Sequence, residues 1–467
     1  MNRRTISQAV AGLFMAAFGI TGIWCIHRSR KIFVNISQFS LPDDIFAYGL
    51  LAFVGIVGLW ALVLASMTAG DPDRNLPGFL QAYADAWRKL VSQKWPLWLV
   101  GSLALISVLG ALIEYGLSWH YLSEELRFRF LGENKTLQSH PILAVALGVQ
   151  RRINSMSWQF IPNVSPSNSG SAQGLAALAL LIPLPWASRR LNSIGNQPEY
   201  SSAARFVRSL IIPVAVLCIA DAAFGLYLRW YTYAHLALQM SGAVNTDYST
   251  KIWAVLNLVG YFTTLLTMTV VLGGVLTGGL AGSLRRSTNR ETVDLNSFLA
   301  NAVEFFKPLA GLFLLVNIVP FLFTLPSDIA FIRHMNNLPV ESAAYLEWFA
   351  FVWKLVPILL MFAPFVITDG NASIWKGVSG SVKAWVNCGY NLLSFTALGV
   401  MGLTVMPFLK SFISQIIPRL LWAQAVWSVL FSIVTTFAGV FMAVAVWEFY
   451  QQIRAHSAES ITEENPE

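Results

Sequence analysis

Three ionisable residues stand inside strongly apolar stretches, and their types could support proton or ion chemistry. They are Glu114, Asp221 and Lys354. A charge within a membrane span costs about 2.5–3.5 kcal/mol, so such residues are functional candidates by default. Counted from the predicted outer ends of their helices, Asp221 and Lys354 lie at matching depths of roughly 10–12 Å. We expect an intramembrane polar cluster of these three in the outer leaflet. It would line a cavity or proton-coupled route, or else be a structural ion pair with Glu114 reaching the interface.

Other residues with catalytic or metal-binding potential are scattered. The histidines are His27, His120, His140, His235, His334 and His456. They form no HxxxH or HExxH pattern, and the three cysteines Cys25, Cys218 and Cys388 lie too far apart for a metal-binding spacing. The sequence also has no Walker or dinucleotide fingerprint. We therefore predict that the chain is not an enzyme and needs no metal or cofactor.

The composition is that of a membrane protein. Of 467 residues, 55% are hydrophobic and 12% are charged, against roughly 25% charged in soluble chains. A chain this poor in charge cannot cover a water-exposed surface. Its net charge of +7 falls mostly in the turns between apolar stretches, which indicates membrane topology and argues against nucleic acid as a partner.

Ten apolar stretches approach the length of about 20 residues that a membrane-spanning helix needs. They are 8–27, 46–69, 96–119, 172–188, 207–229, 253–281, 309–332, 347–368, 390–409 and 421–449. The fourth is the least regular because it contains Pro183 and Pro185. The predicted fold class is all-α, a polytopic bundle of about ten transmembrane helices.

The distribution of lysine and arginine predicts the orientation. Most of them fall in connections that share a side with the N-terminus, whereas the cluster Arg28 to Lys31 is placed outside. The first span is interpreted as a retained helix, or alternatively as a helix on the membrane surface. We expect a multi-pass protein of the bacterial cytoplasmic (inner) membrane with both termini in the cytoplasm.

A short amphipathic segment, here called an elbow, precedes several spans. When the sequence is aligned with itself at an offset of 219 residues, Trp87 and Arg88 match Phe306 and Lys307. At an offset of 295 residues, Arg88 matches Lys383, and Trp375 lies near the start of that copy. This indicates four parallel repeats of span, elbow, span. An elbow could lie at the headgroup boundary as an interfacial helix, or it could dock a cytoplasmic partner.

The repeats divide the chain into segments. The repeats are 46–119, 172–230, 253–333 and 347–412; around them lie an N-terminal helix and connector (1–45), an extracytoplasmic segment (120–171), a final helix (420–451) and a disordered tail (452–467). In the third repeat, Gly274, Gly278 and Gly282 have the GxxxG spacing that lets helices approach closely. Packing within the bundle is expected, with dimerisation as the alternative.

One repeat carries a short motif that resembles a known family. Ala363-Pro364-Phe365-Val366-Ile367-Thr368-Asp369-Gly370, followed by Ser373-Ile374-Trp375-Lys376-Gly377-Val378 and another span, is similar to the repeated unit of uncharacterised bacterial membrane families. These include the membrane domain fused to some glycerophosphodiester phosphodiesterases. The resemblance covers the three better copies and implies architecture only, because no phosphodiesterase domain is attached.

Two functions fit these observations. The favoured one is an integral membrane scaffold or a subunit of a membrane complex, holding protein partners through its elbows or the 120–171 segment and surrounded by membrane lipids. The alternative is a transporter or lipid-handling protein with a polar site among the repeats, but transporters usually show a denser line of intramembrane polar groups.

Overall fold

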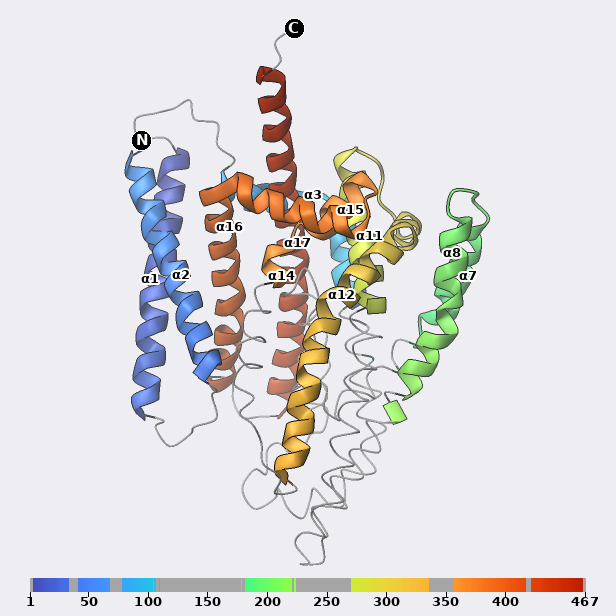
Figure 1. The fold of residues 1–467 in the computed structure, drawn as a ribbon, viewed down its shortest axis with the longest axis horizontal. Coiled ribbons are helices and arrows are strands. Elements are labelled where there is room, and N and C mark those ends of the chain that lie inside the picture. The colour runs from blue at the N-terminus through green and yellow to red at the C-terminus, as the bar shows by residue number, and fades with distance from the viewer. Residues whose placement is uncertain are drawn as a thin grey trace, which may run out of the picture.

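The computed structural model describes residues 3–32, 41–67, 78–103, 181–220, 270–335, 356–416 and 421–464, with a few isolated positions between them. Throughout these ranges the regular secondary structure is helical, which confirms the all-α class for this part of the chain. Long helices run side by side, and shorter segments lie across one end of them (Figure 1).

We call this end the elbow face. It is formed by the elbow helices, by the turns 196–200 and 289–294, and by the end of the last helix. Helix α1 (Arg3–Ile32) begins at this end of the molecule, and α17 (Leu421–Glu464) ends there (Figure 1).

The first two helices form a hairpin at the edge of the molecule. α1 packs along α2 (Leu41–Met67), and glycines allow the close approach. A Cβ atom on Gly58 would lie 2.4 Å from the backbone nitrogen of Ala16, and one on Gly19 would lie 2.6 Å from the Cα atom of Gly55. Larger residues would force these two helices apart.

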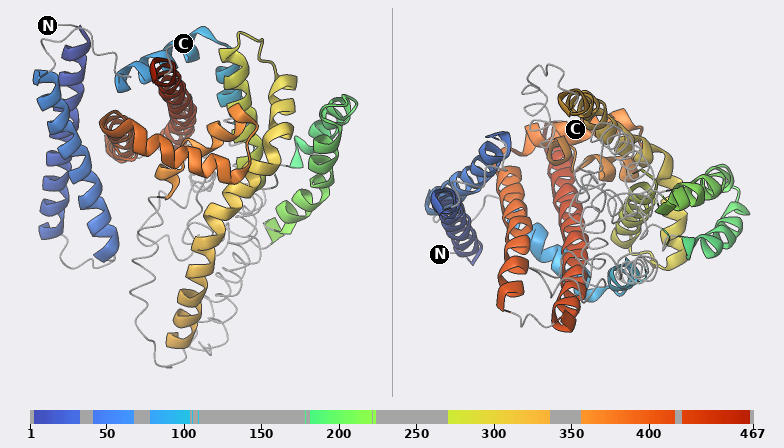
Figure 2. Two further views of the ribbon diagram at one scale, coloured as in Figure 1. Left: turned by 45° about the horizontal axis from the view of Figure 1, so that its top comes forward. Right: turned by 90° about the horizontal axis from the view of Figure 1, so that it is seen from below.

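Helix α3 (Phe79–Ser92) is the first elbow and lies across the upper end of the bundle (Figure 2). Its buried face consists of Phe79, Ala82, Ala86 and Leu90, a spacing of three or four residues that places one side of a helix against its neighbours. The chain turns at Gln93 and starts a new helix at Trp95, which is 4% exposed.

Helices α7 (Leu184–Gly195) and α8 (Ser201–Ser209) form a second hairpin at the opposite edge from α1 and α2 (Figure 1). Leu191, Ile194 and Ala204 pack against Ala300 and Val303 of α12. The helix continues beyond α8 through residues 211–220 after a turn at position 210. The turn lies three residues before Pro213, whose missing N–H disturbs the helical hydrogen bonding there.

Helix α11 (Gly273–Thr288) and α12 (Leu295–Met335) form the third hairpin. Asp294 caps the start of α12: its Oδ1 accepts from the Ser297 N–H at 2.7 Å, and its own N–H donates to the Ser297 hydroxyl at 2.9 Å. This reciprocal pair satisfies orphan groups at the helix N-terminus. α12 then runs without interruption from the elbow face through the predicted span 309–332.

The next predicted span, 347–368, is broken where it is described. A short α14 (Val356–Leu359) is followed by a turn at 360–362 and then by α15 (Ala363–Gly370), which has Pro364 in its first turn. The Ser381 hydroxyl donates to the Leu359 carbonyl at 2.7 Å and lies 3.3 Å from the Phe362 nitrogen, which donates to it. One serine therefore pairs two backbone groups that the break leaves open.

Helix α16 (Ile374–Ile416) joins elbow and span in one element. Its first part crosses the elbow face, and its second part turns down beside α2 and α17 (Figures 1 and 2). α17 then runs back along the whole bundle and passes α3 at the elbow face.

Three helical segments of the described chain are long and apolar enough to cross a membrane: Ile6–Trp24, Ser201–Ala220 and Leu295–Val319. They overlap the predicted spans 8–27, 207–229 and 309–332 at residues 8–24, 207–220 and 309–319. Shorter apolar helices occupy Leu51–Met67, Val356–Gly370 and Asn391–Gly402. These features are compatible with a membrane protein. Large parts of the predicted spans 96–119, 253–281 and 347–368 lie outside the described residues.

Candidate functional site

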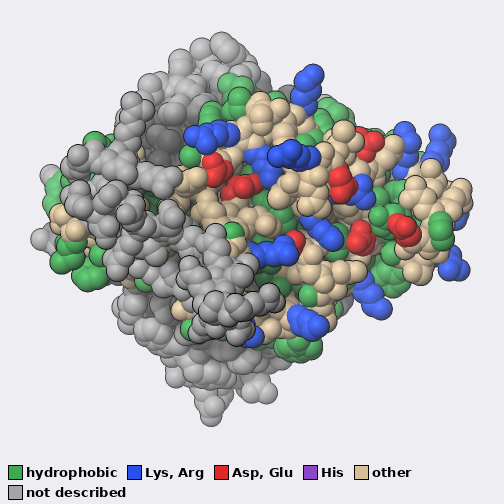
Figure 3. Space-filling view, turned by 90° about the horizontal axis from the view of Figure 1, so that it is seen from above, with side chains coloured by type: hydrophobic (Ala, Val, Ile, Leu, Met, Phe, Trp, Pro, Cys, Tyr) green, Lys and Arg blue, Asp and Glu red, His purple; other side chains and the backbone are tan. Residues whose placement is uncertain are grey.

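Basic side chains gather at the elbow face. The lysines and arginines whose side chains are described and exposed are Arg88, Lys94, Arg189, Arg190, Arg205, Arg208, Arg290, Lys307, Lys376, Lys383 and Arg454. They belong to the elbows, to the hairpins that reach this end and to the end of α17. Seen from above, blue basic groups are spread over this end with acidic groups between them (Figure 3).

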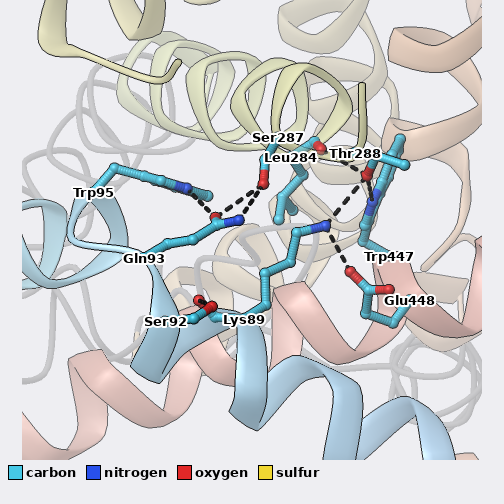
Figure 4. Close-up of polar contacts among 9 residues, drawn as sticks. All are labelled: Lys89, Ser92, Gln93, Trp95, Leu284, Ser287, Thr288, Trp447 and Glu448. Atoms are coloured by element: carbon cyan, nitrogen blue, oxygen red, sulfur yellow. Dashed lines mark hydrogen bonds and ion pairs between the residues drawn. The ribbon is translucent and has the colours of Figure 1, made fainter. Parts of the chain in front are cut away.

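Beneath this surface lies a set of contacts that we call the polar junction: Lys89, Gln93, Ser287, Thr288, Trp447 and Glu448. It joins α3, α11 and α17 (Figure 4). The Lys89 ammonium lies 2.8 Å from Oε1 of Glu448 and donates to the Thr288 hydroxyl at 3.2 Å. The Trp447 indole also donates to Thr288 at 3.1 Å. With side chains only 14% and 19% exposed, Lys89 and Glu448 form a largely shielded pair.

Gln93 forms the second half of the junction. Its amide nitrogen donates to the Ser287 hydroxyl at 2.6 Å, and Oε1 accepts from the Trp95 indole, also at 2.6 Å. Trp95 stands at the start of the helix that follows the first elbow. The turn between elbow and span is thus tied to the end of α11 by a side chain in that turn.

The end of α15 is tied to two other helices. The Arg285 guanidinium donates to the Thr368 carbonyl at 3.0 Å, where a cation also interacts favourably with the helix C-terminus. Asp369 accepts from the Tyr450 hydroxyl at 3.3 Å and pairs with Arg454, both from α17. Thr368 and Asp369 belong to the motif singled out in the sequence, so this motif serves to join α15 to α11 and α17.

Arg286 links the third hairpin to the second. It donates to Oδ1 of Asn301 at 3.0 Å and to the Tyr200 hydroxyl at 3.4 Å, and it lies 3.8 Å from Glu291. Asn301 is 2% exposed. Successive arginines at the end of α11 therefore reach different neighbours, because adjacent residues on a helix point about 100° apart.

An aromatic stack lies beside the junction. Tyr83 stacks on Phe395 with ring centroids 4.8 Å apart, and Phe395 stacks on Phe449 at 4.6 Å. The Tyr83 hydroxyl donates to the Phe395 carbonyl at 2.8 Å. Burial raises the pKa of Tyr83 well above its ordinary value, so this phenol stays neutral and keeps donating. The stack joins α3, α16 and α17.

The predicted elbow residues are spread over three elements and do not meet at one point. Trp87 is 53% exposed and makes edge contacts with the rings of Phe437 and Phe441. Arg88 pairs with Asp85 at 3.3 Å on the surface.

In the other two segments predicted to be copies of this elbow, Phe306 is buried, whereas Lys307 and Lys383 are exposed. Trp375 is 71% exposed. The matched positions Trp87 and Phe306 therefore differ in environment.

The predicted glycine positions lie at the contact between α11 and α12. A Cβ atom on Gly282 would lie 2.5 Å from the Asn301 Cβ, and one on Gly278 would lie 3.4 Å from the Ala302 backbone. Gly274 faces the ring of Phe306 at 3.3 Å. The structure thus places all three within a hairpin of the same chain.

Glu114, Asp221 and Lys354 lie outside the described residues, as does the 120–171 segment. Sequence reasoning missed the residues that hold the elbows together, above all Lys89, Glu448 and Asp369. Glu448 carried one signal, a carboxylate beside a boundary tryptophan at the end of an apolar span. Nothing local pointed to its partner.

Comparison of the chain with protein-family models, curated proteins and solved structures gives no match. The contacts of the polar junction join helices from distant parts of the chain. They hold these helices in fixed relative positions.

Proposed function

We propose that the chain is an integral membrane scaffold or a subunit of a membrane complex, without catalytic chemistry of its own. The observation that carries this proposal is the polar junction. Lys89 and Glu448 link the first elbow to the final helix, and Asp369 with Arg454 links that helix to the last repeat. Contacts of this kind make the elbow face a rigid platform.

Rigidity favours a scaffold over a transporter that rocks one repeat against another. Rocking would separate Lys89 from Glu448 and would leave a charge shielded from water without its partner, which is costly. It would also break the stack of Tyr83 on Phe395. A platform that holds a partner has no need for such a motion.

The platform also presents apolar groups beside basic ones. On the first part of α16, Trp375, Val382 and Val386 are 71%, 46% and 78% exposed. Lys376 and Lys383 stand next to them and are exposed too. Exposed aromatic groups are enriched in surfaces that bind proteins. We propose this surface of α16 as a contact for a cytoplasmic partner.

The membrane placement that goes with this function has the elbow face in the cytoplasm. Its exposed lysines and arginines support that orientation through the positive-inside rule. The proposal includes about ten spans in the bacterial cytoplasmic membrane, four parallel repeats, and both termini in the cytoplasm. The shared position of the α1 start and α17 end supports the last point.

Purification of the full chain from its own membranes in mild detergent tests the scaffold. We expect a partner in constant stoichiometry, and we expect Trp375→Ser with Val386→Ser to lose it. The pair Trp375→Phe with Val386→Ile keeps the surface apolar and should retain the partner. A solitary protein carrying a bound solute, in wild type and variants alike, would contradict the scaffold.

One observation favours the alternative of a transporter or lipid-handling protein. The helix in the predicted span 347–368 is broken between Leu359 and Ala363, and broken helices form substrate sites in many transporters. In this chain Ser381 pairs with the backbone at the break, which leaves those groups less free for a substrate. We therefore rank the scaffold first.

A further inference from the structure

The α7–α8 hairpin carries unpaired positive charge. It has four arginines, Arg189, Arg190, Arg205 and Arg208, and one carboxylate, Glu199 at its tip. All four arginines are exposed, and the ion pairs of the described residues include none of them. Other basic groups at the elbow face, such as Arg88 and Arg454, have carboxylate partners. The hairpin therefore gathers four arginines that have no ion pair within the described part of the chain, and their charge is available for a ligand.

Two of these guanidinium groups are already held in position. Arg190 lies over the ring of Trp186, 5.9 Å from its centroid, and Nε of Arg205 donates to the Ser201 carbonyl at 3.1 Å. Both contacts leave the terminal nitrogens open. A guanidinium that is oriented before binding loses less conformational freedom when it contacts a phosphate.

The charged residues continue into a face that suits acyl chains. Arg205, Arg208, Ile212, Val216 and Ile219 follow one another at intervals of three or four residues, so they share one side of the helical segment Ser201–Ala220. The three aliphatic side chains are 74%, 58% and 53% exposed. At 1.5 Å per residue, Arg208 lies about 6 Å before the first of them.

We propose that this hairpin binds the phosphate groups of anionic phospholipids in the cytoplasmic leaflet. Arg205 and Arg208 contact the headgroup while Ile212 and Val216 lie along its acyl chains. Arg190, beside the exposed Trp186, offers a second contact at the headgroup level. This inference rests on the membrane placement and is independent of the scaffold proposal.

A lipid fits this surface better than a protein does. A soluble acidic partner could reach the arginines, but it could not cover Ile212, Val216 and Ile219, which lie on the part of the helix that is long and apolar enough to cross a membrane. A phospholipid supplies a negative phosphate and apolar chains at the same spacing. Arginine also matches phosphate geometry with paired donors.

Native mass spectrometry of the purified full chain tests this directly, with phosphatidylglycerol and phosphatidylcholine added separately. We expect wild type to bind phosphatidylglycerol in preference to phosphatidylcholine. Arg205→Gln with Arg208→Gln should weaken phosphatidylglycerol binding roughly thirtyfold, since each of the two basic residues near a membrane surface contributes about 1 kcal/mol and every 1.4 kcal/mol is tenfold. Arg189→Gln with Arg190→Gln should act in the same direction.

The matched control removes two exposed charges from elsewhere on the elbow face, Lys94→Gln with Arg290→Gln, and should leave phosphatidylglycerol binding unchanged. Inorganic phosphate at the same concentration should not displace the lipid. Equal wild-type binding of the two lipids, an equal loss in the control, or displacement by phosphate would each overturn the proposal. The comparison of phosphatidylglycerol with phosphatidylcholine uses wild-type protein, so it tests the proposal even if a variant folds poorly.

Discussion

Lys89 and Glu448 are separated by 359 positions in the chain, yet their charged groups lie 2.8 Å apart. The pair joins the first elbow to the final helix and is mostly shielded from water. Thr288, from α11, accepts a hydrogen bond from the same ammonium group. Elements from the beginning, middle and end of the sequence therefore meet at one lysine.

Replacing one member of this pair should destabilise the protein strongly. Lys89→Met leaves the Glu448 carboxylate shielded without a counter-ion, and we expect a loss of about 2–5 kcal/mol. The measurement is the thermal unfolding of the purified chain in detergent. The neighbouring Arg88→Met removes the same charge from a side chain that is 77% exposed, and should cost less than about 1 kcal/mol.

The reversed pair, Lys89→Glu with Glu448→Lys, distinguishes a specific contact from a general need for lysine at this position. It should recover part of the lost stability. If Lys89→Met melts at the wild-type temperature, the pair does not hold α3 in place.

Close packing between α11 and α12 predicts that Gly282 tolerates no side chain. In Gly282→Ala the new methyl group would lie 2.5 Å from the Asn301 Cβ, so we expect a loss of about 1–3 kcal/mol through overpacking. Gly402→Ala is the control, because a Cβ there meets nothing within 4 Å. That change should be neutral or slightly stabilising, since alanine favours the helix. Equal melting temperatures for the two variants would refute the contact.

The break between α14 and α15 predicts a role for Ser381. Ser381→Ala removes the partner of the Leu359 carbonyl and of the buried Phe362 N–H, and should cost about 1–3 kcal/mol. Ser379 contacts only a carbonyl of its own helix at the surface. Ser379→Ala should therefore have little effect in the same unfolding assay. If Ser379→Ala destabilises the protein more than Ser381→Ala does, Ser381 does not stabilise the break between α14 and α15.

The cap of α12 predicts a dependence on pH. Hydrogen bonds from Ser297 hold the pKa of Asp294 below its ordinary value of 3.8. The stabilisation is therefore complete above that value and is lost as the pH falls through the lower folded pKa. At neutral pH we expect Asp294→Ala to lower the free energy of unfolding by about 1 kcal/mol relative to wild type, seen as a lower melting temperature. Under strongly acidic conditions the difference between the two proteins should shrink. If the stability difference between Asp294→Ala and wild type stays constant over the whole pH range, the Asp294 cap is not the source of that difference.

The sequence predicted the apolar helices far better than their contacts. The apolar helical segments Ile6–Trp24 and Leu295–Val319 overlap the predicted spans 8–27 and 309–332, because hydrophobic length is a local property of the sequence. The elbow and the span of α16 were expected as separate segments, but the structure joins them in one bent helix. Lys89 and Glu448 show what local patterns cannot reveal, because their pairing depends on how α3 and α17 cross. The predicted repeat did not indicate the environment of matched positions either, since Phe306 is buried and its counterpart Trp87 is half exposed.

We propose that all the elbows lie on the cytoplasmic side of the membrane. Single cysteines at the exposed positions 88, 196, 291 and 376, one from each predicted repeat, test this placement in a chain whose Cys25, Cys218 and Cys388 are replaced by serine. A membrane-impermeant maleimide should label every one of them in inside-out vesicles and none in right-side-out vesicles. Labelling of any one of the four from the outer side would contradict the shared elbow face and the scaffold built on it.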